Sequence, residues 1–459
     1  MDTNMRNTDA FAWYMEEDPT LLSTIVGVAW LEQSPDWDRL VETIDRATRV
    51  IPMFRQRVVE AAGRLAPPRW TDDEAFDLTR HIRRMFPPEP ATDATVVTLA
   101  RAATMTAFDR AHPLWEFTLV EHLDGDRAAL VMKVHHALTD GIGGMQLALE
   151  LFDLEPVAPA RASIPDAAYP TRAPEPIFGP ERRAIRSAIA ATLRAARNPA
   201  RSVAESYETV RSISRTLAPV RDTLSPIMKG RSASRQLDIL EVQLRDLERA
   251  ATTAGGSVND GFMAAVTGGL RHYHELHGAP VDQLRVTLPI SIRTPEDPPG
   301  GNRITLIRFA VPVADRDAAS RIRAMGPLCR VARDERSLRF TGPIAGLLNL
   351  LPRGVIGSML KHVDFVASDI QGFEFPVYLA GACMERYVAF APTVGTAVNF
   401  ALLSYNGTCC IGVAMDPAAV PDPDGLIACA REGFEEVLAL GGPHDAVHLP
   451  LHAHARRAR

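Results

Sequence analysis

A change of composition in the middle of this 459-residue chain limits the folds that are open to it. From Glu155 to about Arg235 the chain is rich in Pro, Ala and Arg and shows no strand pattern, whereas both flanking parts mix short apolar runs with amphipathic segments. The length by itself also favours more than one domain. We therefore predict an N-terminal half in residues 1–155, a partly helical linker in residues 156–235 and a C-terminal half in residues 236–459.

The N-terminal half has the pattern of an α/β fold. Ile25–Leu31 is a short apolar run typical of a buried strand, and Ser34 followed by proline then offers a cap for a helix. Two further apolar runs, Trp115–Glu121 and Ala128–Val134, flank a turn that contains Asp-Gly, which is typical of a hairpin. The second strand of this hairpin leads directly to a pair of histidines, His135 and His136.

The C-terminal half repeats this mixture of strands and helices. Strands are predicted at Leu237–Val242, Arg285–Ile292 and Ile304–Val311, and a long helix is predicted to begin at Asn259. Tyr387–Met415 carries no charge and is long enough to cross a bilayer, but proline, glycine and an Asn-Gly turn interrupt it. We therefore expect strands there, and two α/β halves of comparable size.

Charge and cysteine content exclude several classes of function. The net charge of −6 gives no general attraction to phosphate backbones, so nucleic acid is not an expected partner. Five cysteines lack metal-ligand spacing and fit reduced thiols. Residues Met1–Asp9 carry charges where a signal peptide needs an apolar stretch. We therefore expect a cytoplasmic protein.

The linker contains a basic amphipathic segment. Residues 180–236 hold twelve Lys or Arg against four Asp or Glu, a local charge of +8. A helix around Arg182–Arg197 would place alanine and isoleucine on one face and arginine on the other. Such a helix can lie on an anionic membrane or a lipid droplet, or it can pack its apolar face on a neighbouring domain. The sequence does not separate these two interpretations.

The segment His135-His136-Ala137-Leu138-Thr139-Asp140-Gly141 carries the chemistry. Neighbouring side chains of a strand point to opposite faces, so only one of the two histidines can address a given cavity. A neutral imidazole is suited to remove a hydroxyl proton near neutral pH. Asp140 is placed to shape the loop or to form a fixed ion pair. Gly141 is expected to allow backbone angles closed to other residues and to leave room beside the histidine. A metal site is the weaker interpretation, because adjacent histidines on opposite faces chelate poorly.

The sequence resembles the bacterial wax ester synthase/acyl-CoA:diacylglycerol acyltransferase family, a branch of the CoA-dependent acyltransferases marked by HHxxxDG. The resemblance covers nearly the whole chain. Besides HHALTDG it rests on Asp9, Trp13-Tyr14, Phe76-Asp77-Leu78, His81, Pro113-Leu114-Trp115-Glu116, Asn259-Asp260, Pro289-Ile290-Ser291-Ile292-Arg293, Gly301-Asn302, Pro376-Val377-Tyr378-Leu379-Ala380-Gly381 and Leu403-Ser404-Tyr405-Asn406-Gly407.

This resemblance implies two chloramphenicol-acetyltransferase-like domains with an active-site tunnel between them. It also implies that His136 is the base, that Asp140 holds the loop through an arginine, for which Arg293 is the candidate, and that Asn259 and Asp260 belong to a motif considered important in the family. The alternative for the last two is a helix cap.

The resemblance further implies an oxyanion donor, for which Ser368 lies at the corresponding position. The family usually reads Ser/Thr-Asn-Val-Pro-Gly where this chain has Ser368-Asp369-Ile370-Gln371-Gly372. The introduced carboxylate would be unhelpful beside an oxyanion unless it points away.

The implied reaction transfers a long acyl chain from acyl-CoA, a co-substrate, to diacylglycerol or a long-chain alcohol, without a cofactor or a metal. The expected location is the cytoplasm, and contact with the inner membrane or a lipid droplet surface stays open as one of the two interpretations of the basic segment. Two alternatives stay open: a condensation-type acyltransferase that uses a carrier-bound thioester, and a non-catalytic lipid-binding or droplet-associated paralogue.

Overall fold

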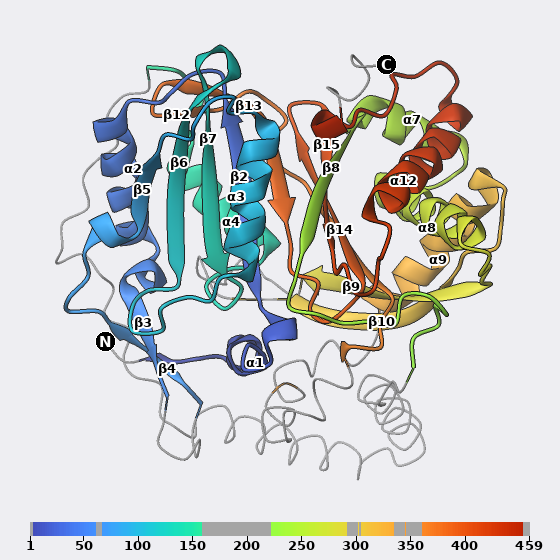
Figure 1. The fold of residues 1–459 in the computed structure, drawn as a ribbon, viewed down its shortest axis with the longest axis horizontal. Coiled ribbons are helices and arrows are strands. Elements are labelled where there is room, and N and C mark those ends of the chain that lie inside the picture. Colours follow the sequence, from blue (N-terminus) through green and yellow to red (C-terminus); the bar gives the residue numbers. More distant parts are fainter. Residues whose placement is uncertain are drawn as a thin grey trace, which may run out of the picture.

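Two six-stranded sheets and the helices around them make up the body of the molecule (Figure 1). The computed structural model describes residues 3–60, 67–157, 222–291, 302, 304–334, 345 and 360–452. Arg293 and the basic segment Arg182–Arg197 lie outside the described residues. The α/β character predicted for both parts of the chain is confirmed.

The first sheet contains the strand that leads to the histidine pair. Its strands, in spatial order, are β12 (Tyr378–Leu379), β13 (Ala382–Phe390), β2 (Thr24–Leu31), β7 (Arg127–His135), β6 (Trp115–Leu123) and β5 (Ile82–Met85). One apolar cluster joins a face of this sheet to α2 (Trp37–Val50) and α4 (Gly141–Leu151). A second cluster joins the opposite face to α3 (Asp93–Met105).

The second sheet carries its helices on one face. Its strands, in spatial order, are β10 (Ile304–Pro312), β9 (Gln283–Ser291), β11 (Phe365–Ile370), β14 (Val398–Tyr405), β15 (Thr408–Met415) and β8 (Gln236–Gln243). One large apolar cluster packs this sheet against α7 (Leu244–Thr253), α8 (Val258–Leu276), α9 (Ala318–Arg333) and α12 (Pro423–Leu438), at the right of Figure 1.

The C-terminal part of the chain is not confined to the second sheet. Strands β12 and β13 leave it and complete the first sheet, where β13 pairs antiparallel with β2, Val388 opposite Val28. The sheets meet where β13 crosses β15, because a Cβ at Gly412 would lie 2.2 Å from the Ala389 carbonyl oxygen. The two sheets therefore do not correspond to the two halves predicted from the sequence, because two strands that follow residue 236 belong to the first sheet.

Two smaller units complete the N-terminal region. Strands β1 (Thr3–Asn4), β4 (Arg69–Asp72) and β3 (Gln56–Val59) form a three-stranded sheet. Helix α1 (Asn7–Met15) lies near the lower ends of both large sheets in Figure 1. The segment that follows α1 contacts the C-terminal part of the chain, since the Lys361 ammonium lies 2.6 Å from the Asp18 carboxylate.

Local signals explain where the elements begin and turn. Gly125 has a φ of 73° in the turn between β6 and β7, and Asn406 and Gly407 have φ of 45° and 82° between β14 and β15, as Asn-Gly turns require.

The predicted cap of α2 is wrong by two residues. Asp36, not Ser34, caps this helix, and its carboxylate accepts the Arg39 N–H at 2.9 Å.

Candidate active site

Strand β7, an interior strand of the first sheet, ends at the two histidines. His135 is the last residue of β7 and pairs with Thr24 of β2. The chain then turns and enters α4, whose N-cap is Asp140. The backbone N–H of His136 donates to the Ser23 carbonyl at 2.8 Å, which fixes the first residue of the turn.

His135 is enclosed by protein. Its side chain has no exposed surface, and its ring lies 6.0 Å from that of Trp13 and 5.9 Å from that of Phe108. Nδ1 accepts the Ala137 N–H at 2.9 Å, and Nε2 lies 3.1 Å from Oε2 of Glu16. The ring is therefore closed off from a substrate, with Nδ1 hydrogen-bonded to the backbone and Nε2 in close contact with the Glu16 carboxylate.

His136 differs from its neighbour in its exposure and in the hydrogen bonding of its Nδ1. The residue is half-buried, and its buried Nδ1 has no hydrogen-bond partner from another described residue. Burial lowers the pKa of this imidazole, and a hydrogen bond with its own backbone and the charge of Asp140 only partly oppose that shift. At neutral pH the ring is therefore uncharged and can accept a proton.

Asp140 holds the turn through backbone contacts. It is buried, its carboxylate accepts the Gly143 N–H at 2.7 Å, and its carbonyl accepts the Gly144 N–H at 2.7 Å. The carboxylate satisfies an amide in the first turn of α4 that no helical carbonyl can reach, and the carbonyl accepts the first bond of the helix. The carboxylate thus shapes the loop, as predicted. The ion pair predicted with Arg293 stays a prediction, because Arg293 lies outside the described residues.

Gly141 is needed for space and not for special backbone angles. It is the first residue of α4, and its φ is not in the left-handed region, so the expectation of special backbone angles is wrong. A Cβ at this position would lie 2.8 Å from Cδ1 of Ile370. Glycine therefore allows β11 of the second sheet to approach the turn that carries His136.

Ser368 lies on the same face of β11 as Ile370. Side chains alternate along a strand, and Ile370 packs toward the first sheet, whereas Phe365 and Ala367 belong to the helix-covered core. Two residues span about 6.6 Å of strand, so Ser368 lies one step along the same face from Ile370, the residue that contacts Gly141. Its Oγ is buried and has no partner among the described residues.

The same alternation explains the unusual Asp369. This residue shares its strand face with Phe365 and Ala367, opposite to Ser368. Its carboxylate interacts electrostatically with Arg333, the last residue of α9. The carboxylate therefore points away from the Ser368 hydroxyl, which is the condition that the sequence left open.

Asn259 and Asp260 lie at the start of α8. The Asp260 carboxylate accepts the Ser257 N–H at 2.9 Å while the Ser257 hydroxyl accepts the Asp260 N–H at 3.3 Å, a reciprocal cap. The Asn259 amide contacts Cys329 of α9 at 3.6 Å. These contacts support the helix-cap interpretation, and none of them joins either side chain to the histidine turn.

Sequence reasoning missed Glu16 and Ser23. Glu16 follows α1, and its Oε1 accepts the Ser23 N–H at 2.8 Å while Oε2 faces His135. A single carboxylate at a helix end has no distinctive spacing. The only available signal was its place three residues after Trp13, in a block already matched to the family.

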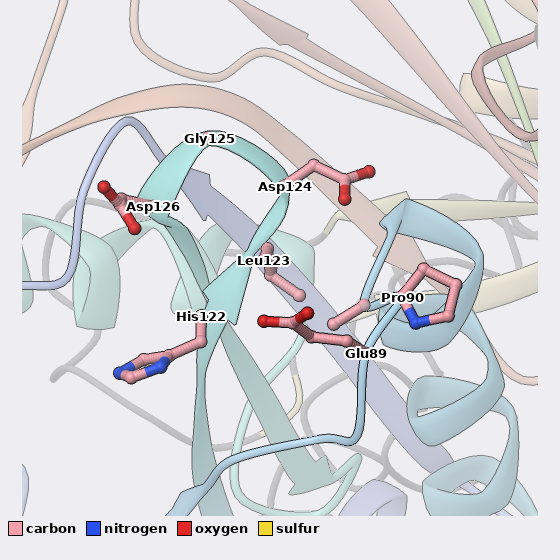
Figure 2. Close-up of a pocket in the computed structure, with 8 residues that line it drawn as sticks. Glu89, Pro90, His122, Leu123, Asp124, Gly125 and Asp126 are labelled. Atoms are coloured by element: carbon pink, nitrogen blue, oxygen red, sulfur yellow. The ribbon is translucent and has the colours of Figure 1, made fainter.

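A pocket of about 550 Å³ lies elsewhere (Figure 2). It is lined by the turn between β6 and β7, with Asp124, Gly125 and Asp126, and by the segment that carries Glu89 and Pro90. This turn is at the opposite end of β7 from His135. The pocket is thus separate from the histidine turn, and a tunnel between the two halves stays a prediction.

The described residues offer neither a metal-binding group nor a membrane-spanning helix. No group of three or more His, Cys, Asp or Glu side chains there could hold a metal ion. No described helix combines the length and the apolar character needed to cross a membrane.

Comparisons of sequence place the chain among known acyltransferases. Residues 5–262 match the wax ester synthase/diacylglycerol acyltransferase catalytic domain, and residues 300–437 match the C-terminal domain of the same family. A Mycobacterium tuberculosis protein assigned as a diacylglycerol O-acyltransferase is 34% identical over 450 residues, which cover 94% of this chain and 91% of the relative. A second protein of that organism with the same assignment is 25% identical over 419 residues, with 88% of each chain covered.

Solved structures share the fold. The wax ester synthase/diacylglycerol acyltransferase from Marinobacter aquaeolei VT8 superposes with a TM-score of 0.67 at 20% identity, covering 96% of this chain and 100% of that one. The starter condensation domain of rhizomide synthetase, in complex with C8-CoA, gives a TM-score of 0.59 at 12% identity and covers 98% of both chains. The protein is therefore an acyltransferase and belongs to the wax ester synthase/diacylglycerol acyltransferase family.

Proposed function

We propose that this enzyme transfers a long acyl chain from acyl-CoA to the hydroxyl of diacylglycerol or a long-chain alcohol, with His136 as the general base. The observation that carries the proposal is the contrast between the histidines. His135 is fully enclosed, whereas His136 is half-buried. The His136 imidazole is uncharged at neutral pH because burial lowers its pKa, and it belongs to the turn that β11 contacts at Gly141. The reaction needs no cofactor, because acyl-CoA supplies the acyl group and CoA is the leaving group.

The proposed step is a direct displacement. The His136 imidazole removes the hydroxyl proton while the alcohol oxygen attacks the thioester carbonyl. The Ser368 hydroxyl donates a hydrogen bond to the oxygen that becomes negative in the tetrahedral state. Collapse of that state breaks the carbon–sulfur bond, and the imidazolium returns its proton to the CoA thiolate. An ester and free CoA leave, and no acyl group is bound to the enzyme.

The decisive assay measures CoA release and ester formation by the purified protein with a long-chain acyl-CoA and either diacylglycerol or hexadecanol. We expect ester formation with wild type, and a loss of at least about a thousandfold in His136→Ala with an unchanged circular dichroism spectrum. Undiminished activity of His136→Ala would exclude it as the base. No CoA release from any acyl-CoA would favour the non-catalytic alternative.

Because condensation domains share this fold, the assay also tests an acyl chain bound to a carrier protein as the donor. An acyl thioester of acyl carrier protein, at the same acyl chain length, is supplied beside acyl-CoA. We expect a higher kcat/KM with acyl-CoA. The opposite preference would replace the proposed donor by a carrier-bound acyl chain while leaving the role of His136 intact.

We further propose a cytoplasmic enzyme that contacts a lipid surface, because both acceptors are water-insoluble. Leu154 and Val157 follow α4 and are 66% and 84% exposed, and they immediately precede the segment that contains the basic amphipathic stretch Arg182–Arg197. Sedimentation with anionic liposomes should fall when Arg182–Arg197 is deleted. Unchanged sedimentation would contradict the role given to this stretch.

A further inference from the structure

The Glu16 carboxylate contacts His135 directly and also binds Ser23, the residue whose carbonyl holds the backbone of His136. Its Oε1 accepts the Ser23 N–H at 2.8 Å, and the Ser23 carbonyl accepts the His136 N–H at 2.8 Å. Its Oε2 lies 3.1 Å from Nε2 of His135. One side chain from the N-terminal segment is thus connected to the histidine turn through two separate routes.

The tautomer of His135 follows from these contacts. Nδ1 accepts the Ala137 N–H at 2.9 Å, so in the neutral ring the proton is on Nε2, the atom that faces Glu16. A carboxylate suits this arrangement, because it can only accept. The side-chain amide of glutamine would still accept the Ser23 N–H, but its NH₂ group would then face the His135 N–H.

The surroundings keep Glu16 ionised and in place. Burial alone would raise the pKa of this carboxyl, but His135, the Ser23 N–H and Arg110 hold it below its usual value. The Arg110 guanidinium lies 3.9 Å from Oε2 of Glu16 and 4.0 Å above the Trp13 ring. The carboxylate therefore remains a fixed acceptor under the conditions in which the enzyme works.

We propose that Glu16 is a positioning residue for acyl transfer: by fixing the His135 tautomer and the backbone of Ser23, it sets the orientation of His136. This inference rests on the proposed function, because it assigns His136 as the base. Glu16 touches neither substrate nor reacting atom. It acts by keeping the turn His135–Ala137 in one conformation.

The test compares Glu16→Gln with Glu17→Gln, a substitution at the exposed neighbouring position. We expect Glu16→Gln to lower kcat by about 10- to 100-fold, with KM for acyl-CoA within about twofold of wild type and Tm nearly unchanged. Glu17→Gln should match wild type. An unchanged kcat in Glu16→Gln, with wild type active, overturns this inference and leaves the proposed function standing.

A double-mutant cycle separates positioning from a general structural effect. His135→Asn keeps an oxygen where Nδ1 accepts the Ala137 N–H but removes the group that faces Glu16. If Glu16 acts through His135, adding Glu16→Gln to His135→Asn should change kcat by less than about threefold. Full additivity of the two losses, or a fall in Tm that parallels the fall in kcat, would contradict the proposal. An inactive wild type would instead refute the proposed function itself.

Discussion

His136 is half-buried and belongs to the turn that β11 approaches at Gly141. Desolvation penalises the protonated ring and lowers its pKa, and the nearby Asp140 carboxylate pulls in the other direction. The balance favours the neutral base. A histidine needs little adjustment to act as a base near pH 7, so a lowered pKa keeps the ring available for this role.

The rate of acyl transfer should therefore rise with pH along a limb whose midpoint is below 6.5, the ordinary histidine value. The active form is deprotonated, so a lowered pKa moves the limb toward acid. Asp140→Asn should move it further, because the carboxylate charge favours the imidazolium, while asparagine preserves the helix cap. A limb centred above 6.5, measured as kcat/KM against pH, would count against His136.

Opposite faces of β11 give Ser368 and Asp369 opposite consequences. We expect Ser368→Ala to lower kcat by about 100- to 1000-fold, because a buried donor to the oxyanion is lost. Asp369→Asn changes the other face of the strand and should alter kcat by less than about threefold. Steady-state kinetics of both variants at saturating acyl-CoA decide this. Equal losses in the two would mean that their side chains are not separated as described.

At the scale of elements, the site depends on the approach of α4 to β11. The prediction is that Gly141→Ala destabilises the protein by about 1–3 kcal/mol, because its methyl group would meet Cδ1 of Ile370 at 2.8 Å. Adding Ile370→Val removes that atom and should recover part of the loss. Chemical denaturation of the single and double variants measures it, and no recovery would place the strain elsewhere.

Local patterns in the sequence predicted the elements well where a few neighbouring residues decide the structure. The Asp-Gly and Asn-Gly turns and the strand that ends at His135 are of this kind. The reason for Gly141 was not predictable, since the residue that requires it, Ile370, is far away in the sequence. The contact of Glu16 with His135 could not be predicted from the sequence for the same reason.

At the scale of the whole molecule, β13 is an exchanged strand, since it comes from the C-terminal part of the chain but pairs in the first sheet. Arg386 of β13 forms ion pairs with both parts of the chain. Its guanidinium lies 2.5 Å from Asp93 of α3, 3.0 Å from Glu241 of β8 and 4.0 Å above the Trp30 ring of β2. The group is largely buried, with 13% of its side chain exposed. Removal of the charge would leave two carboxylates in a poorly hydrated place.

Arg386→Met should therefore lower the free energy of unfolding by about 3–5 kcal/mol, the range for one lost partner of a buried ion pair. Arg127→Ala is the matched control, because Arg127 also pairs with Asp93, at 3.1 Å, but is more exposed. It should cost less than about 1 kcal/mol. Urea denaturation at constant salt compares them, and similar losses would show that burial does not govern this network.

The sequence revealed the strands in Tyr387–Met415 but not their partners. The apolar run indicates burial but names no partner, and it contains only the end of β13, Tyr387–Phe390, so nothing local assigns that strand to β2 rather than to β14. Two α/β halves were therefore predictable, while the exchange between them was not. The chemistry at His136 was more predictable than its supports, because motif residues are contiguous and the supports come from distant segments.

The exchanged strand also governs the order of events during synthesis. A ribosome releases Thr24–Leu31 long before Ala382–Phe390, so β2 must wait for its neighbour through most of translation. During that interval one edge of an eight-residue apolar strand is open to any other chain. Nascent copies of this protein therefore stay open to mispairing at β2 until β13 has been made and has paired with it.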